Sequence, residues 1–245
     1  MNKKITVLGL SLLLMVGSVF AQDTKKMQER LNSSYPNLGV MEVEYLKDIK
    51  LYEMKMKDNA TPGYTNEGID FFLISGEIVD PKNKVNYSKE RAFIKVSKFF
   101  NSLPIDKAIT VKYGKGTRKM AIFTDPDCPF CKQLDNELHS KITKEDVTIY
   151  YFMNPLNIQG HEQAPLKAAK IWCSKDKGKA WVDWMTKGVL PNNDGGCKNP
   201  VAETKQFSTD LGFNSTPRIF LDNGYTADQV ITAEQLMSAF KIRKP

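Results

Sequence analysis

The sequence predicts a two-domain protein in which a small, mainly β domain precedes a larger α/β domain. The chain has 245 residues, which is more than one ordinary hydrophobic core requires. Apolar and polar residues alternate in residues 41–56, whereas strand and helix patterns follow one another from residue 105 onward. We expect a signal segment at residues 1–21, an N-terminal domain at 22–86, a linker helix at 87–103 and a C-terminal domain at 104–245.

The first 21 residues have the pattern of a cleavable export signal. Lys3 and Lys4 precede an apolar stretch that ends at a small residue, Ala21. A helix that crosses a bilayer usually needs about 20 apolar residues, and this stretch is shorter. We therefore expect cleavage after Ala21 and export of the remaining chain.

The composition gives little support for a nucleic-acid partner. The net charge is +7, and it is two lower without Lys3 and Lys4. No run of basic residues is interleaved with aromatic ones. We expect the charges to form a solvated surface, and we expect no cofactor.

Residues 22–86 are expected to be mostly β. Met41, Val43 and Tyr45 alternate with acidic residues, which is typical of a half-buried strand. The run "IDFFLISGEIVD", residues 69–80, is apolar on both faces around Ile69 to Ile74 and predicts a strand that must be covered on both sides. A domain of about 65 residues can hardly supply such cover, so we expect a second copy of the chain to do so.

A helix is predicted between the two domains. Phe93, Val96, Phe100 and Leu103 recur at spacings of three and four residues, and Pro104 ends the pattern. The helix could be packed like any other or act as a strut between the domains, and its position favours the strut.

The C-terminal domain is expected to contain a sheet covered on both faces. The run "KMAIFTD" predicts a strand, and Phe130, Leu134, Leu138 and Ile142 mark one face of a helix. The run "VTIYYFM" is apolar throughout, as in a strand buried on both sides.

Most of the remaining chain before the strand "RIFL" is expected to be helical. Its three tryptophans, Trp172, Trp181 and Trp184, are expected to be core residues. A last helix follows "RIFL", and Thr232 and Gln235 have the spacing of a capping box for it.

The chain has four cysteines, Cys128, Cys131, Cys173 and Cys197. An exported protein meets an oxidising environment, and four cysteines allow three pairings. A zinc ribbon would need a second Cys-x-x-Cys. Cys173 and Cys197 are far apart and no His lies near either, so we expect no metal site.

The pair Cys128 and Cys131 follows a strand and opens a helix. Unpaired N–H groups at a helix N-terminus favour a thiolate, so the pKa of Cys128 should lie below the free value of about 8.5. Cys131, one turn further on, could then resolve a mixed disulfide.

A bridge between Cys173 and Cys197 would close a loop of about 25 residues and stabilise the fold by roughly 3.5 kcal/mol. The short loop between Cys128 and Cys131 would gain about half of that, which makes this pair the reactive candidate.

Charged neighbours could oppose this chemistry. Asp125 and Asp127 would raise the pKa of a nearby thiol, although Asp127 is expected to act mainly as a helix cap. His139 and His161 have no neighbouring ligand set in the sequence. Each is expected to be a surface or capping residue rather than a catalyst.

Thr216 and Pro217 precede the strand "RIFL". A proline there is by default an edge or turn residue. A cis Thr-Pro bond would instead expose a backbone edge with which an extended substrate could pair.

These motifs resemble a known fold. A strand, a Cys-x-x-Cys at the start of a helix, a helical insertion and a late Thr-Pro resemble the thioredoxin fold. With the export signal, the β-rich N-terminal domain and the linker helix, "FTDPDCPFCKQL" and "STPRIFLDNG" resemble the periplasmic DsbC/DsbG family of thiol:disulfide isomerases. The run Asp-Pro-x-Cys-Pro-aromatic-Cys-Lys-Gln is most similar to DsbG, whereas Cys173 and Cys197 resemble the structural disulfide of DsbC.

The resemblance implies an α+β, cystatin-like N-terminal dimerisation domain and a C-terminal α/β thioredoxin-fold domain with a helical insertion. It implies a V-shaped homodimer joined near residues 69–80. Cys128 would be the nucleophile and Cys131 the resolving thiol, and Thr216 with cis-Pro217 would contact bound polypeptide. A DsbD-type membrane reductase would regenerate the reduced state in the periplasm.

The function predicted from these residues is a disulfide isomerase that attacks incorrect disulfides in misfolded secreted proteins, with chaperone-like substrate binding. One alternative is a DsbG-like reductase that repairs sulfenylated cysteines. Others are a chaperone or binding module whose cysteines are secondary, and a direct dithiol oxidase.

Overall fold

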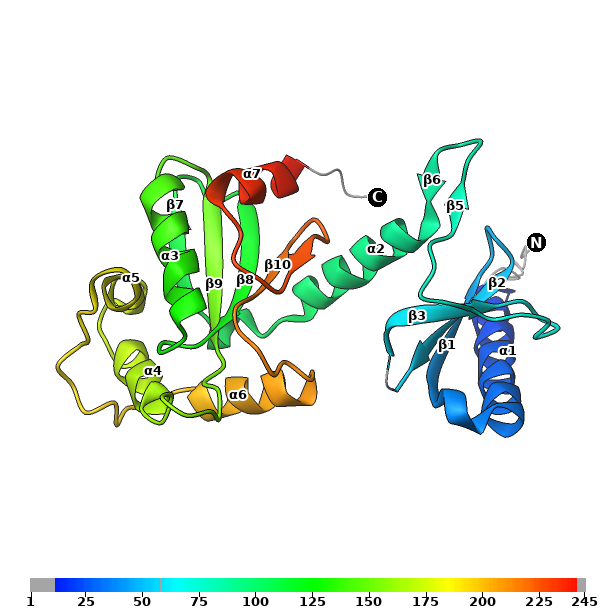
Figure 1. The fold of residues 1–245 in the computed structure, drawn as a ribbon, viewed down its shortest axis with the longest axis horizontal. Coiled ribbons are helices and arrows are strands. Elements are labelled where there is room, and N and C mark those ends of the chain that lie inside the picture. The colour runs from blue at the N-terminus through cyan, green and yellow to red at the C-terminus, as the bar shows by residue number, and fades with distance from the viewer. Residues whose placement is uncertain (1–11, 58, 242–245) are drawn as a thin grey trace, which may run out of the picture. The chain divides into compact units, whose positions relative to one another are not determined.

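The computed structural model of the protein describes residues 12–57 and 59–241. The first eleven residues of the expected signal segment lie outside this part of the chain. The chain folds as two compact units that divide between Val85 and Asn86 (Figure 1). Within the described ranges, no helix combines the length and the apolar character that crossing a membrane requires.

The first unit is an antiparallel sheet with one helix packed on it. The strands lie in the order β1–β2–β3–β4, and Met27 and Leu31 of helix α1 are buried together with Met54 of β2. Asn32 ties the helix to β1, because its Nδ2 donates to the Val40 carbonyl oxygen at 2.9 Å and its Oδ1 accepts from Val40 N at 3.1 Å. The elements are α1 (Leu12–Ser34), the short 3-10 helix η1 (Pro36–Leu38), β1 (Val40–Leu46), β2 (Leu51–Met56), β3 (Asn59–Thr65) and β4 (Leu73–Ile74).

Helix α1 corrects the expectation that the N-terminal domain is mostly β from residue 22 onward. The helix runs through the predicted cleavage position at Ala21 and ends at Ser34. Met27 and Leu31 lie four residues apart, so they share one helical face and bury it on the sheet. The first unit is therefore α+β, as the resemblance implied, rather than mostly β.

The apolar segment at residues 69–80 is not one strand, which corrects the sequence prediction. Only the two-residue strands β4 and β5 (Val79–Asp80) lie in it, and β5 pairs with β6 (Val85–Asn86). Ile69 and Ser75 have left-handed backbones, with φ of 59° and 58°. Such residues cannot continue an extended strand, so the run is broken at both places.

Several side chains of this segment are apolar and exposed. Exposed fractions are 46% for Phe71, 43% for Ile74 and 50% for Val79. Exposed apolar residues within one short segment are typical of a surface that another chain covers. Cover by a second copy of this chain stays a prediction.

The second unit is built on a five-stranded mixed sheet in the order β11–β10–β8–β9–β7. Strands β8 and β9 are parallel, whereas β7, β10 and β11 each run antiparallel to a neighbour. The expected strands "KMAIFTD", "VTIYYFM" and "RIFL" correspond to β8, β9 and β10. The strands are β7 (Ile109–Tyr113), β8 (Arg118–Thr124), β9 (Val147–Met153), β10 (Arg218–Leu221) and β11 (Thr226–Ala227).

Helices cover both faces of this sheet, as its continuously apolar strands predict. Along β8, Met120 and Ile122 lie in one hydrophobic core and Ala121 and Phe123 in the other, which is the period of two of a strand. The first core also takes residues from α3, α4, α5 and α7 and Val201 from the start of α6, and the second takes residues from α2 and the rest of α6. Figure 1 shows these helices around the sheet. The helices are α2 (Tyr87–Ser102), the short 3-10 helix η2 (Ile105–Lys107), α3 (Pro129–Lys141), α4 (Ala164–Trp172), α5 (Lys177–Lys187), α6 (Val201–Asp210) and α7 (Ala233–Lys241).

Helix α2 packs on the second unit through its C-terminal half. Phe100 is buried in the second core, and Ser97 Oγ donates to the Asp222 carbonyl oxygen at 3.1 Å. The Phe93 backbone lies directly against Gly224, whose φ of 99° and missing Cβ permit this approach. The helix is thus packed against the domain that follows it, and a further role as a strut stays a prediction.

The helical insertion between β9 and β10 buries only one of its three tryptophans completely. Trp181 is 0% exposed. Trp172 and Trp184 are half-buried, and each has a lysine ammonium over its ring. Both pack against the first core as partly buried residues, so of the three expected core anchors only Trp181 is fully buried.

The last helix, α7, begins as the sequence predicts. Thr232 N donates to Gln235 Oε1 at 2.8 Å, and Gln235 N donates to Thr232 Oγ1 at 3.1 Å. Two N–H groups that the helix itself cannot satisfy are thereby paired, and the predicted capping box is confirmed.

Candidate active site

Two free cysteines lie at the junction of β8 and α3. Helix α3 begins at Pro129, so Cys128 is its N-cap residue, and a proline at the first helical position preorganises the first turn. Cys128 and Cys131 are unbridged, with exposed fractions of 4% and 0%. Phe130 between them is 61% exposed. Little of Cys128 therefore reaches the surface, and an exposed aromatic side chain lies two residues away in the sequence.

The pKa values of the two thiols are shifted in opposite directions. A hydrogen bond with the Cys131 side chain is the largest cause that lowers the pKa of Cys128 to about 6, although burial works against it. The Thr216 side chain and the backbone N–H groups of Cys131 and Phe130 lower it further. Burial, and next the neighbouring Cys128 sulfur, raise the pKa of Cys131. Backbone dipoles thus contribute as the sequence suggests, but the second thiol contributes more.

Thr216 meets the cysteine pair from a distant part of the chain. The Thr216–Pro217 peptide bond is cis, and Cys128 Sγ donates to the Thr216 carbonyl oxygen at 3.5 Å. Strand β10 starts at the next residue and pairs with β8, which ends just before the motif. Sheet pairing therefore brings the two segments together.

Asp125 and His161 form a buried pair behind the motif. The Asp125 carboxylate is 0% exposed and accepts from His161 Nδ1 at 2.8 Å, from Asp127 N at 2.7 Å and from Leu156 N at 2.7 Å. His161 is 9% exposed, so the expectation of a surface residue is wrong. The pair joins the motif loop to the start of the helical insertion.

Asp127 does not cap helix α3, which corrects the sequence prediction. No side-chain cap hydrogen bond is present at Cys128, and Asp127 Oδ1 accepts from Lys167 Nζ of α4 at 2.5 Å. Trp184 Nε1 of α5 donates to the Pro126 carbonyl oxygen at 2.8 Å. The loop before Cys128 is therefore held by two helices of the insertion.

His139 also lies in the interior, which contradicts the expectation of a surface or capping residue. It is 8% exposed, and its Nε2 lies 2.9 Å from Asp135 Oδ1. The same oxygen accepts from the Tyr151 hydroxyl at 2.6 Å and from Trp181 Nε1 at 3.3 Å. The Tyr113 hydroxyl contacts His139 Nδ1 from β7. This polar cluster lies within the first core and binds α3 to the sheet and to α5.

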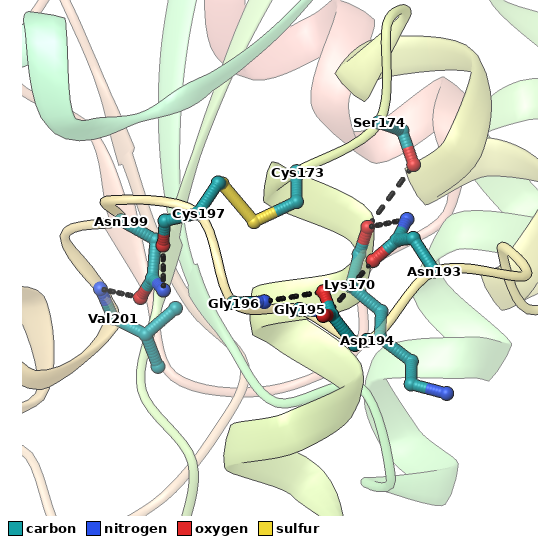
Figure 2. The surroundings of a disulfide bond; sticks show 10 residues. All are labelled: Lys170, Cys173, Ser174, Asn193, Asp194, Gly195, Gly196, Cys197, Asn199 and Val201. Atoms are coloured by element: carbon teal, nitrogen blue, oxygen red, sulfur yellow. Dashed lines mark hydrogen bonds between the residues drawn. A yellow bond between two sulfur atoms is a disulfide. The ribbon is translucent and has the colours of Figure 1, made fainter.

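Cys173 and Cys197 form a disulfide in the insertion (Figure 2). Cys173 is the C-cap of α4, Cys197 lies in the loop before α6, and their Cα atoms are 5.7 Å apart. Asn193 Nδ2 donates to the Lys170 carbonyl oxygen at 3.0 Å, so the same loop is tied to α4 a second time (Figure 2). Closing this loop stabilises the fold by about 3.5 kcal/mol on the chain-entropy model.

The described residues offer no evident metal site. Among them, no three or more His, Cys, Asp or Glu side chains are grouped so that they could hold an ion.

Comparisons with known proteins agree with this fold. The pattern of the thioredoxin-like domain matches residues 105–241. The chain therefore belongs to the thioredoxin-like domain family.

Individual similar proteins show which members of this family the chain resembles. The chain is 31% identical over 173 residues to a protein of Bordetella parapertussis named "Probable thiol:disulfide interchange protein DsbC", covering 71% of this chain and 59% of that protein. It is 25% identical over 249 residues to "Thiol:disulfide interchange protein DsbC" of Dickeya dadantii. That alignment covers 100% of this chain and 97% of the relative. The crystal structure of a disulfide interchange protein from Neisseria gonorrhoeae is 42% identical, with a TM-score of 0.52, over 58% of this chain and 99% of that one. The resemblance to the DsbC/DsbG family is confirmed.

Sequence patterns did not find every residue that shapes the site. Lys167 and Trp184 look like ordinary members of amphipathic helices, and only the folded insertion brings them to Pro126 and Asp127. The sequence shows His161 near the start of the insertion. Nothing in the sequence indicates its contact with Asp125.

Proposed function

We propose that this chain is an exported thiol:disulfide interchange protein that isomerises or reduces incorrect disulfides in secreted proteins. The observation that carries the proposal is the place of two unbridged thiols at the start of α3, where Cys128 Sγ lies 3.5 Å from the Thr216 carbonyl oxygen, just before cis-Pro217. The pKa shifts agree with it, because the pKa of Cys128 is lowered to about 6 and that of Cys131 is raised. With such a pKa, roughly nine-tenths of Cys128 is thiolate at neutral pH, and the thiolate is the form that attacks disulfides. The names of the similar proteins point the same way.

Each step exchanges one sulfur–sulfur bond for another. The Cys128 thiolate attacks a substrate disulfide, forms a mixed disulfide and releases one substrate cysteine as a thiolate. If another substrate thiolate then attacks the mixed disulfide, a new substrate disulfide forms and Cys128 leaves as a thiolate, which is isomerisation. If Cys131 loses its proton and attacks instead, the substrate leaves reduced and Cys128 and Cys131 become a disulfide.

The reductive route consumes the reduced cysteine pair. Each turnover oxidises Cys128 and Cys131 by two electrons, so a dithiol reductant must restore them. The resemblance supplies a candidate of that class, a DsbD-type membrane reductase in the periplasm. Isomerisation needs no such reductant, because the substrate keeps its electron count.

Substrate binding is proposed for the surface around Cys128. Thr216 and Pro217 adjoin the thiol, and an extended polypeptide could pair with their backbone. Phe130, 61% exposed, adds an apolar contact for unfolded chains and supports chaperone-like binding. We infer further that the exposed apolar segment at residues 69–80 joins two copies of the chain.

Refolding of a scrambled protein with several disulfides tests the proposal directly. The reduced protein is expected to restore the activity of the scrambled substrate, and Cys128→Ala to leave it at the uncatalysed rate. Cys131→Ser keeps the attacking thiolate, so mass spectrometry should find a mixed disulfide with the substrate. A Cys128→Ala variant as active as the parent would refute the proposed function.

Two further measurements separate the related activities. Faster reaction with a sulfenylated protein than with a scrambled one would favour repair of oxidised cysteines. Suppression of aggregation that survives in a Cys128→Ala, Cys131→Ala variant would show that substrate binding does not depend on the thiols.

A further inference from the structure

The loop before Cys128 is attached to the helical insertion at two consecutive residues. The Asp127 side chain is 7% exposed, and its Oδ1 accepts from Lys167 Nζ at 2.5 Å. The carbonyl oxygen of Pro126 accepts from Trp184 Nε1 at 2.8 Å. Two separate helices, α4 and α5, therefore hold the residues that lead into the nucleophile.

Trp184 also orients the lysine. Lys167 Nζ lies 5.0 Å from the centre of the Trp184 ring, and Lys132 Nζ lies 4.8 Å from the same centre. An indole face attracts ammonium groups, and the ring is itself fixed through its N–H on Pro126. The Lys167 side chain is only 24% exposed, so its ammonium is held at Asp127 rather than moving freely in solvent.

A carboxylate at position 127 needs this partner. Its second oxygen, Oδ2, is buried and has no hydrogen-bond partner among the described residues. A buried negative charge without a counter-ion is costly, and next to a thiol it disfavours the thiolate by like-charge repulsion. The ion pair with Lys167 removes both effects.

We propose that Lys167 is a positioning residue that neutralises the buried Asp127 carboxylate, so that Cys128 can become a thiolate beside an acidic residue. The inference rests on the proposed function only in that the thiolate is the attacking group. The charged and titratable groups that surround the loop are Asp125 with His161 behind it, Lys132 at the indole ring, Lys167 on α4 and Cys131 on α3.

The test is a pH titration of Cys128 in the reduced, full-length protein. The rate of alkylation of Cys128 by iodoacetamide, followed by mass spectrometry, reports its thiolate fraction at each pH without any client protein. Lys167→Met keeps an unbranched apolar side chain on the indole and removes the charge. The midpoint is expected to rise by about one pH unit. Lys177→Met is the matched control, because Lys177 lies 3.6 Å from the centre of another insertion indole, Trp172, and should leave the midpoint unchanged.

A second variant separates charge from packing. In the double variant Lys167→Met, Asp127→Asn the carboxylate is gone as well, so the midpoint should return to that of the parent. Asp127→Asn alone leaves the ammonium facing the thiolate and should lower the midpoint, which provides a test even if Lys167→Met does not fold.

A parental midpoint in Lys167→Met, a shift that persists in the double variant, or a rise in Asp127→Asn would each overturn the proposal. The titration involves no disulfide substrate, so its outcome is independent of the refolding assay. An inactive protein with the expected shifts would refute the proposed function and leave the role of Lys167 standing.

Discussion

The Cys128 thiol lies 3.5 Å from the carbonyl oxygen of Thr216, across 88 residues of sequence. Thr216 is 8% exposed, and among the described residues its hydroxyl has no hydrogen-bond partner. A buried, unsatisfied hydroxyl is costly, yet beside Cys128 it can donate to the thiolate once that forms. The Thr216 side chain is accordingly one of the causes that lower the pKa of Cys128.

Thr216→Val should raise the pKa of Cys128, because valine fills the same space but cannot donate to the thiolate. We expect the midpoint of Cys128 alkylation to rise by about half a pH unit or more. Thr216→Ser keeps the hydroxyl and is the matched control, with a midpoint near that of the parent. Equal shifts in both variants would show that the hydroxyl is not the cause.

The reduced protein should become more stable as the pH rises above about 6. The pKa of Cys128 is about 6 in the fold, below the free value of about 8.5, so the folded state releases its proton first. The thiolate therefore stabilises the fold at higher pH, and this stabilisation is lost as the pH falls through the folded pKa. The raised pKa of Cys131 has the opposite effect, because above about pH 8 this thiol ionises in the unfolded chain but not in the fold. The gain in stability with pH is therefore expected between roughly pH 6 and 8.

Urea unfolding of the reduced protein across this window measures the effect. The free energy of unfolding should rise by up to about 1.4 kcal/mol per pH unit relative to Cys128→Ser, which has no thiol to ionise there. Identical pH slopes for the two proteins would contradict the lowered pKa.

The sequence predicted the local elements of the site well, because their signals are local. The apolar period of β8, the Cys-x-x-Cys at the start of α3 and the capping box at Thr232 each lie within a few neighbouring residues. The prediction of one strand at residues 69–80 was wrong, because composition alone does not reveal the left-handed backbones at Ile69 and Ser75.

The charged residues of the site were harder to predict for a different reason. Asp125 and Asp127 find their partners only after the insertion has folded. His139 meets Tyr151 only when α3 packs on the sheet, although its contact with Asp135 lies within α3. A histidine that pairs with a carboxylate 36 residues away has no periodic pattern to mark it. Such contacts follow from tertiary packing, which overrides the usual preference of polar residues for the surface.

Removing Asp135 should destabilise the protein strongly without altering the thiol chemistry. Its Oδ1 accepts from Tyr151 and Trp181 and contacts His139, all inside the first core. Asp135→Ala would leave the buried Trp181 N–H without its acceptor and would leave Tyr151 and His139 with only their contacts to each other and to Tyr113. We expect a loss of about 3 kcal/mol or more in the free energy of unfolding. Asn136→Ala, an exposed neighbour on the same helix, should cost less than about 1 kcal/mol.

The titration of Cys128 distinguishes a structural role for this cluster from a chemical one. Alkylation midpoints of Asp135→Ala and the parent should agree under conditions where both are folded. A shifted midpoint in Asp135→Ala would mean that the cluster acts on the thiols and not only on stability.

Gly224 should be the most sensitive position in the packing of α2. A Cβ there would lie 2.3 Å from the Phe93 carbonyl oxygen, and φ is 99°. Gly212 is a matched control, because its φ of 71° is also left-handed but a Cβ there would meet nothing within 4 Å. Gly212→Ala should therefore cost only the backbone strain of about 1 kcal/mol. Gly224→Ala should cost about 1 to 3 kcal/mol more, because α2 must move away from β10. Urea unfolding of the two variants compares these costs, and equal losses would show that the contact between Phe93 and Gly224 does not hold α2 in place.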